Sequence, residues 1–144
     1  MKKIIILLLF INISLFGSDA SAALRLEIIK SIVLGIDNYQ SMPLYSDDKE
    51  LMSFLSNEKK INIAKNCKNS KLVILSNIDH LPKNYKNKYI FVLDYDLLYE
   101  IPESFGAFYW KKGRPNIIFI RPRLLKSSLN LIDDLKPYIE DKVW

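Results

Sequence analysis

Apolar residues recur every three or four positions in several segments of the chain, which is the spacing of a helix that buries one face. Ser46-Asp47-Asp48 has the side chains preferred at a helix N-cap, and a helical pattern follows it directly. Pro122 suits the first position of a helix, where its missing N–H does no harm. The predicted helices are 24–37, 48–55, 94–99, 122–129 and 131–143, the last with Pro137 in its middle.

Shorter segments rich in β-branched and aromatic residues predict strands. The predicted strands are 60–64, 71–76, 88–93, 105–110 and 116–121, with 42–45 a weaker candidate because it contains Pro43. The continuous apolar runs LVIL at 72–75 and YIFVL at 89–93 suit strands that are covered on both faces. The order of elements predicts a single three-layer α/β domain with a mixed, mostly parallel sheet of about five strands.

Residues 105–121, FGAFYWKKGRPNIIFIR, predict a hairpin in which the four residues KKGR join two apolar strands. In strand geometry Phe108 and Trp110 share one face, and Phe105, Ala107 and Tyr109 share the other. Both faces are therefore apolar. The hairpin is expected either to lie between two layers or to present one face to a partner.

The N-terminus has the pattern of an export signal. Lys2 and Lys3 precede an apolar run over 4–16, and Ala20-Ser21-Ala22 is a small-x-small cleavage sequence. We expect a signal peptide over 1–22, cleavage after Ala22 and a periplasmic location. The run is shorter than the roughly 20 residues that span a bilayer, although an uncleaved N-terminal anchor is the alternative. No later segment is long and apolar enough to be transmembrane.

The remaining residues, 23–144, fit one domain with one core. Without Lys2, Lys3 and Asp19, the 21 basic and 16 acidic residues become 19 and 15, a net charge of about +4. This small excess, with acids interspersed, favours solubility and argues against a nucleic-acid partner. Cys67 is the only cysteine, so no intrachain disulfide can form, and an inert or partly buried thiol is expected.

Polar residues follow the two runs expected to form central strands. If those strands are parallel neighbours, both loops open at the carboxyl edge of the sheet, where open α/β sheets bind ligands. The predicted ligand-binding residues are Ser76, Asn77, Asp79, His80, Asp94 and Asp96. The alternative is that Asp79 and Asp96 are helix N-caps and His80 is a surface residue.

The chain lacks the sequence patterns of common enzymes. It has no Gly-rich phosphate loop, no G-x-S-x-G elbow and no H-E-x-x-H, and His80 is its single histidine. A metal site is not expected, because only one histidine and no spaced pair of soft ligands occur. We therefore expect a non-enzymatic protein with no catalytic residues, no metal and no cofactor.

Aromatic and basic residues are combined at the hairpin, as they are at interface hot spots. Phe108 and Trp110 are the predicted partner-binding anchors, with Lys112 and Arg114 at the rim. The partner is expected to be a second copy of the chain or a membrane-anchored signalling protein. A solvated turn beside an ordinary core is the alternative.

The sequence resembles the small YfiR-like periplasmic regulators in its order of elements and in the segments Gly106-Ala107-Phe108, Asn116-Ile117-Ile118-Phe119 and Leu124-Leu125. The resemblance implies a periplasmic regulator that restrains a membrane-anchored signalling enzyme such as a diguanylate cyclase. The paired cysteines of well-known members are absent, so their disulfide control is not implied here. The alternative function is a small periplasmic solute-binding protein that takes a small anionic ligand at the sheet-edge loops.

Overall fold

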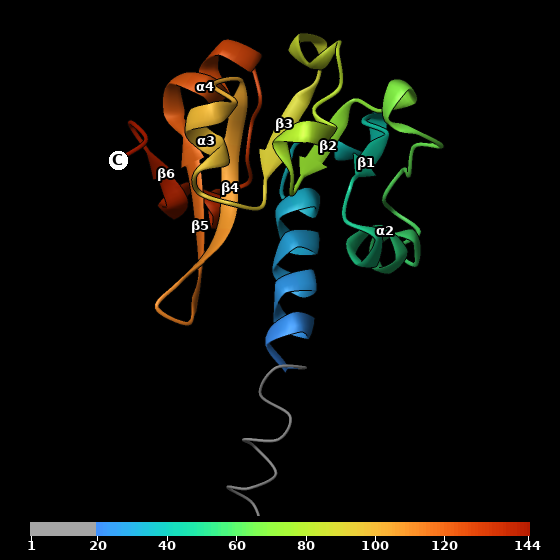
Figure 1. Cartoon of the computed structure of the whole chain (residues 1–144), viewed down its shortest axis with the longest axis horizontal. Helices are drawn as coiled ribbons and strands as arrows, with labels where there is room; N and C mark the ends of the chain where they lie inside the picture. The colour runs from blue at the N-terminus through green and yellow to red at the C-terminus, as the bar shows by residue number, and fades with distance from the viewer. Residues whose placement is uncertain (1–19) are drawn as a thin grey trace, which may run out of the picture.

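Six strands form one sheet in the order β1-β2-β3-β4-β5-β6 in the computed structural model, which describes residues 20–144 (Figure 1). The strands are β1 Leu44–Ser46, β2 Leu72–Leu75, β3 Tyr89–Val92, β4 Ser104–Lys111, β5 Arg114–Ile120 and β6 Ile139–Glu140. Strands β1 to β4 are parallel, β5 is antiparallel to β4, and β6 is parallel to β5. The predicted α/β fold with a mixed, mostly parallel sheet is confirmed, with six strands where about five were expected.

The two continuous apolar runs form the central parallel strands. Every residue of β2 is buried, and β3 is buried except for the half-buried Tyr89. Their register pairs Val73 with Ile90 and Ile74 with Phe91. Successive side chains point to opposite faces of a strand, so such runs need cover on both faces.

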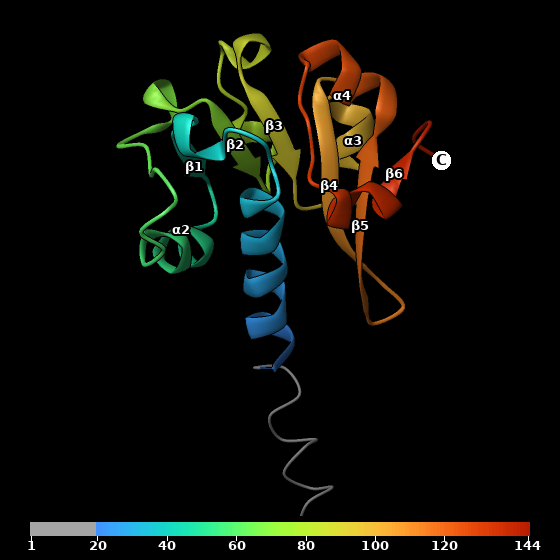
Figure 2. The same ribbon diagram turned by 180° about the vertical axis from the view of Figure 1, so that it is seen from behind.

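Two separate hydrophobic clusters supply that cover. The first joins the sheet to the N-terminal helix, described from residue 20 to 34, and to α2 Lys49–Ser56. The second joins the opposite face to α3 Leu97–Glu100, which lies over β4 (Figure 1). The view from behind shows the N-terminal helix and the β4–β5 hairpin extending toward the same end of the molecule (Figure 2).

Three phenylalanines of the first cluster pack against one another. The ring centroid of Phe91 lies 5.6 Å from that of Phe105 and 6.1 Å from that of Phe119. Gly106 makes this packing possible, because a Cβ there would lie 2.5 Å from the carbonyl oxygen of Ile118 and 2.8 Å from the Phe119 ring. The β3–β4 register shifts beside Phe91, and this irregularity places Phe105 in the same cluster as Phe108. The prediction that Phe105 shares a face with Ala107 is therefore wrong.

The hairpin turn is shorter than predicted. Lys111 pairs with Arg114, which leaves Lys112 and Gly113 as the two turn residues. Both have positive φ, 52° and 72°, as a type I′ turn requires. The strands of the hairpin consequently extend further toward the tip than a four-residue connection would allow.

Two predicted elements are wrong. Residues 60–64 form no strand but meet β1 through a single bridge between Ile63 and Leu44. The final helix over 131–143 is replaced by a 3-10 helix, Asp133–Tyr138, and by strand β6. Pro137 cannot donate the backbone hydrogen bond of an α-helix interior, which disfavours the predicted helix.

The other helices follow the sequence pattern closely. α2 has Asp48 as its N-cap, and α4 Arg121–Ser127 has a proline in its first turn. The helix expected over 94–99 is shorter and begins at Leu97.

The signal peptide prediction lies largely outside the described residues, since only residues 20–22 of it belong to the described part of the N-terminal helix.

Candidate functional site

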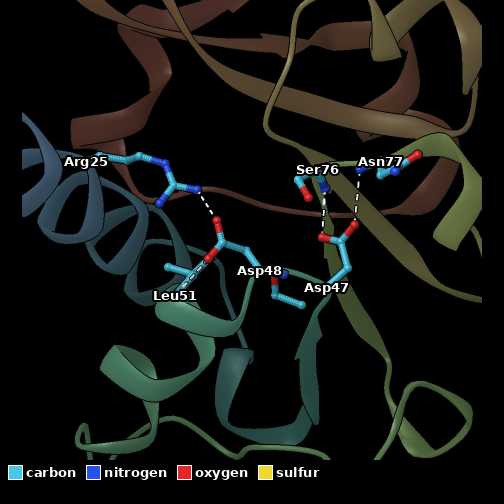
Figure 3. A network of polar contacts seen from close by, with 7 residues as sticks. Arg25, Asp47, Asp48, Leu51, Ser76 and Asn77 are labelled. Atoms are coloured by element: carbon cyan, nitrogen blue, oxygen red, sulfur yellow. Dashed lines mark hydrogen bonds and ion pairs between the residues drawn. The ribbon is translucent and has the colours of Figure 1, made fainter.

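Asp47 occupies the sheet edge at which the loops after the parallel strands meet. It directly follows β1, and its side chain is 3% exposed. One carboxylate oxygen accepts a hydrogen bond from the backbone N–H of Ser76 at 2.8 Å, and the other accepts from Asn77 N–H at 3.1 Å (Figure 3). Asp47 therefore holds the first two residues of the loop after β2.

His80 completes this cluster from the same loop. Its Nδ1 lies 2.9 Å from the Asp47 carboxylate, while its side chain is 56% exposed. Asn77 uses its own side-chain oxygen to accept from the N–H of Asp79 at 2.9 Å, which caps the 3-10 turn Ile78–His80. The polar groups of this loop are thus largely engaged with one another.

The neighbouring Asp48 joins α2 to the N-terminal helix (Figure 3). It accepts a hydrogen bond from Leu51 N–H at 3.0 Å and forms an ion pair with Arg25. The pKa of Asp48 lies below its usual value: burial is the largest influence and raises it, but the Leu51 hydrogen bond and the Arg25 charge outweigh burial. Asp48 is a capping residue held in its charged form.

The loop after β3 stands apart from this cluster. Asp94 and Asp96 are exposed, and Asp94 accepts a hydrogen bond from Asp96 N–H at 2.9 Å. Within residues 20–144, no hydrogen bond or ion pair joins either carboxylate to Asp47, Ser76 or His80. Of the six predicted ligand-binding residues, the structure thus gathers Ser76, Asn77 and His80 around Asp47, with Asp79 adjacent in the same turn.

The sheet-edge cluster has limited means for chemistry. Asp47 and His80 have the contact by which a carboxylate orients an imidazole, but no described serine or cysteine side chain contacts the outer nitrogen of His80. Among the described residues, no three His, Cys, Asp or Glu side chains are grouped as a metal site. The contacts that are present fix the loop.

The hairpin offers a different kind of surface. Phe108 is 1% exposed and belongs to the core, whereas Trp110, two residues closer to the tip, is 40% exposed. Their rings meet edge to face at a centroid distance of 5.7 Å. Phe108 is therefore not available as a partner-binding anchor, which corrects that prediction. Its ring instead packs against the buried side of the Trp110 ring.

A cavity of about 610 Å³ lies beside Trp110, between the hairpin and the C-terminal residues. Its lining includes Tyr95, Tyr109, Trp110, Ile117, Glu140 and Trp144. The rings of Tyr95 and Tyr109 meet at 4.9 Å, and the Tyr95 hydroxyl accepts from Trp144 N–H at 2.9 Å. Burial, followed by the nearby Tyr95 and Glu140, raises the pKa of Tyr109, so this tyrosine stays neutral. We call this cavity the aromatic groove.

The aromatic groove borders a strand edge that is only partly covered. Within the described part of the chain, β6 pairs with β5 only at Phe119 and Ile120, so residues 114–118 have β4 alone as a partner. Unpaired strand edges are ready to accept an added strand. Pro115 lies in this segment and lacks an N–H, which limits such pairing to the groups around Ile117.

The cations of the turn have no acidic partners in the described part of the chain. Lys111, Lys112 and Arg114 are exposed, and none of them forms an ion pair within residues 20–144. A partner with acidic side chains would meet them at the tip.

Several residues of these sites are not predicted by the sequence pattern. The sequence pattern assigns Asp47 to the N-cap of the following helix. Its position directly after a strand is the one signal that could have placed it at the edge of the sheet. Tyr95 and Trp144 come together only through the tertiary fold, because 49 positions separate them along the chain. No local pattern joins them.

The chain matches no family model, no curated protein and no solved structure. In the part of the chain that the structure describes, every helix is too short or too polar to cross a membrane.

Proposed function

We propose that this chain is an exported, non-enzymatic regulatory protein, which binds a membrane-anchored signalling protein through its β4–β5 hairpin. The observation that carries the proposal is Trp110, which is 40% exposed beside the aromatic groove although Phe108 beneath it is fully buried. A large aromatic ring left accessible on a hairpin is the kind of group that anchors protein interfaces.

The surroundings of Trp110 indicate the chemistry of the segment that would bind. The aromatic groove supplies apolar and tyrosine surface. The tip supplies Lys111, Lys112 and Arg114, which form no ion pair with any residue that the structure describes. An extended segment with one aromatic or branched apolar side chain and a nearby acidic residue would complement both. Opposite charges at the rim would mainly speed association, while the apolar side chain in the groove would supply most of the affinity.

The sheet-edge loops support a ligand-binding function less well. Asp47, the most buried carboxylate of that cluster, already accepts hydrogen bonds from two backbone N–H groups and contacts His80. These groups would have to release their partners before they could hold a solute.

Site-specific photo-crosslinking tests the proposal in the exporting cell. A benzoylphenylalanine in place of Lys111, which lines the aromatic groove, should yield an adduct with the extracytoplasmic part of a membrane signalling protein. The same photoreactive residue in place of the exposed Lys59, just after α2, serves as the control and should yield no such adduct.

Trp110→Ala then measures the contribution of the anchor. Truncation of a central aromatic anchor typically costs about 2 kcal/mol or more, so binding of the identified partner should weaken at least tenfold. Lys112→Ala should weaken it far less. The melting temperature of each variant must stay close to that of the parent. The proposal is refuted if the photoreactive residue at position 111 gives no more adduct than the one at position 59. It is also refuted if Trp110→Ala binds the partner as tightly as the parent does. An adduct between two copies of the chain would show that the hairpin binds a second copy and not a signalling protein.

A further inference from the structure

A second, smaller cavity lies at the end of the molecule opposite the hairpin tip. Its volume is about 160 Å³, and α4 forms one wall. Figure 1 shows α4 at the end of the sheet that lies away from the hairpin tip. The other walls come from the segments that lead into β3 and β4. This cavity shares no lining residue with the aromatic groove, so a ligand bound in it would be independent of the proposed function.

Four of the residues that line this cavity are cations. They are Lys86, Lys88, Arg123 and Lys126, while Glu103 is the single acid of the lining. Among the described residues, none of the four forms an ion pair. The cavity wall therefore has a formal charge of about +3, with Glu103 as the only acid that lines it.

Lys88 is buried although it carries a charge. Its Nζ donates to the carbonyl oxygens of Ser70 at 2.5 Å and Cys67 at 3.0 Å, and it lies 3.3 Å from the Lys68 carbonyl. These acceptors satisfy its hydrogen bonds but are neutral. Lys88 thus contributes a fixed positive charge without being a direct ligand.

Arg123 is the residue that can contact a ligand directly. Its Nη1 donates to the carbonyl oxygens of Leu98 at 2.9 Å and Ser104 at 3.1 Å, which fixes the guanidinium in place. Its Nε and Nη2 contact no acceptor in the described chain, and neither nitrogen is buried without a partner. Burial lowers the pKa of Arg123, and the Glu103 charge opposes that change. A preoriented guanidinium edge with free N–H donors matches an oxyanion.

We propose that this cavity is a binding site for a single phosphate-type oxyanion, held by the free edge of Arg123 and by Lys86 and Lys126. The volume restricts the ligand, because about 160 Å³ is well below the roughly 300–1,000 Å³ of sites for larger molecules. Lys86 and Lys126 are exposed, and the long side chain of a lysine can turn its ammonium group toward an ion. An ordinary solvated lysine surface would not include the buried Lys88 or the fixed Arg123.

Isothermal titration of the exported chain with inorganic phosphate tests the site, at constant ionic strength set with chloride. Lys126→Gln should weaken phosphate binding about tenfold, since it removes one charge-assisted hydrogen bond. Lys59→Gln makes the same change of net charge at a position outside the cavity and should leave the affinity unchanged. Equal weakening by both variants would mean that phosphate binding depends only on the net charge of the protein. The proposed site would then be refuted.

Glu103→Gln provides a test with the opposite sign. It removes the only acid of the lining, so phosphate should bind about threefold more tightly. Glu58→Gln, at a half-buried glutamate after α2, should not have this effect.

Binding to lipid vesicles distinguishes a lipid phosphate from the free phosphate ion as the ligand. Co-sedimentation with phosphatidylglycerol vesicles, lost in Lys126→Gln and retained in Lys59→Gln, would assign the site to a lipid phosphate. Tight binding of inorganic phosphate without vesicle binding would assign it to the free ion. If the parent chain binds neither inorganic phosphate nor the vesicles, the proposal is refuted.

Discussion

The first three strands and the last three differ in how far the side chains near them are engaged in contacts within the fold. Around β1 to β3, Asp47 and Asp48 are engaged with backbone N–H groups, with Arg25 and with His80. Around β4 to β6, Trp110 is 40% exposed, the cations of the turn form no ion pair within residues 20–144, and the edge of β5 is partly open. Both regions lie in one sheet, yet Asp47 and Asp48 are held by contacts within the fold, while Trp110 is left accessible.

This difference separates residues that stabilise the fold from residues that can bind. Polar side chains at the carboxyl edge of a parallel sheet are common ligands, but a carboxylate that accepts hydrogen bonds from a neighbouring loop has another role. An exposed aromatic ring on a strand end needs no rearrangement before it meets a partner. The hairpin is for this reason the stronger functional candidate, even though the sheet-edge loops carry more of the residue types associated with chemistry.

The largest expected effect comes from a charge in the phenylalanine cluster. Phe91→Asp should abolish folding, because Phe91 is 1% exposed, and an unpaired buried charge costs several kcal/mol against a total stability of about 5–15 kcal/mol. Soluble yield and circular dichroism of the purified chain measure this effect.

Trp110→Asp is the matched change in the other region and should lower stability by only about 1 kcal/mol, because the ring is partly exposed. Equal loss of fold in both variants would show that Trp110 is as much a core residue as Phe91. The contrast between the two regions would then fail.

At the sheet edge we expect an effect that is smaller than that of Phe91→Asp. Asp47→Ala removes the acceptor for Ser76 N–H and Asn77 N–H and the contact to His80, so it should cost about 2–3 kcal/mol in a urea unfolding experiment. Asp94→Ala removes only the hydrogen bond to Asp96 N–H and should cost less than about 1 kcal/mol. If Asp94→Ala costs as much as Asp47→Ala, the loop after β3 is also a structural clamp.

The sequence pattern predicts most of the fold because its strongest signals are local. LVIL and YIFVL are continuous apolar runs, and Asp48 stands directly before a helical pattern. The failures have physical causes that act over longer distances. Strand β6 has only two residues, and it forms because the chain returns beside Phe119 and Ile120. The position of Phe105 depends on a register irregularity that alternation along the strand cannot reveal.

The candidate site is harder to predict than the fold. Trp110 can be recognised, because an aromatic residue beside a cationic turn is visible in the sequence. Asp47 and the aromatic groove cannot, since both depend on which segments the fold brings together. The prediction for Phe108 is wrong because strand alternation indicates which face a residue lies on, but not where along the hairpin the cover of that face ends.

The smallest expected effect is a pH dependence that Asp48 gives to the first region. Its pKa is lowered in the folded chain, because the Leu51 hydrogen bond and the Arg25 charge together outweigh burial, the largest single influence, which raises it. Its ionised form therefore stabilises the fold above the unfolded pKa of about 3.9, and this contribution is lost as the pH falls through the lower folded pKa. Asp48→Asn keeps a good N-cap but removes the charge. The parent should exceed the variant in stability by about 1 kcal/mol at pH 7.

That difference should shrink as urea unfolding is repeated at pH values from about 5 down to about 2, the range over which a carboxylate with a lowered pKa becomes protonated. Asp133→Asn is the control, because Lys136 also lowers the pKa of Asp133, but the carboxylate lies in an exposed pair that solvent screens. Its curve should run parallel to that of the parent over the whole range. A parallel curve for Asp48→Asn as well would mean that the Arg25 contact adds nothing beyond the cap.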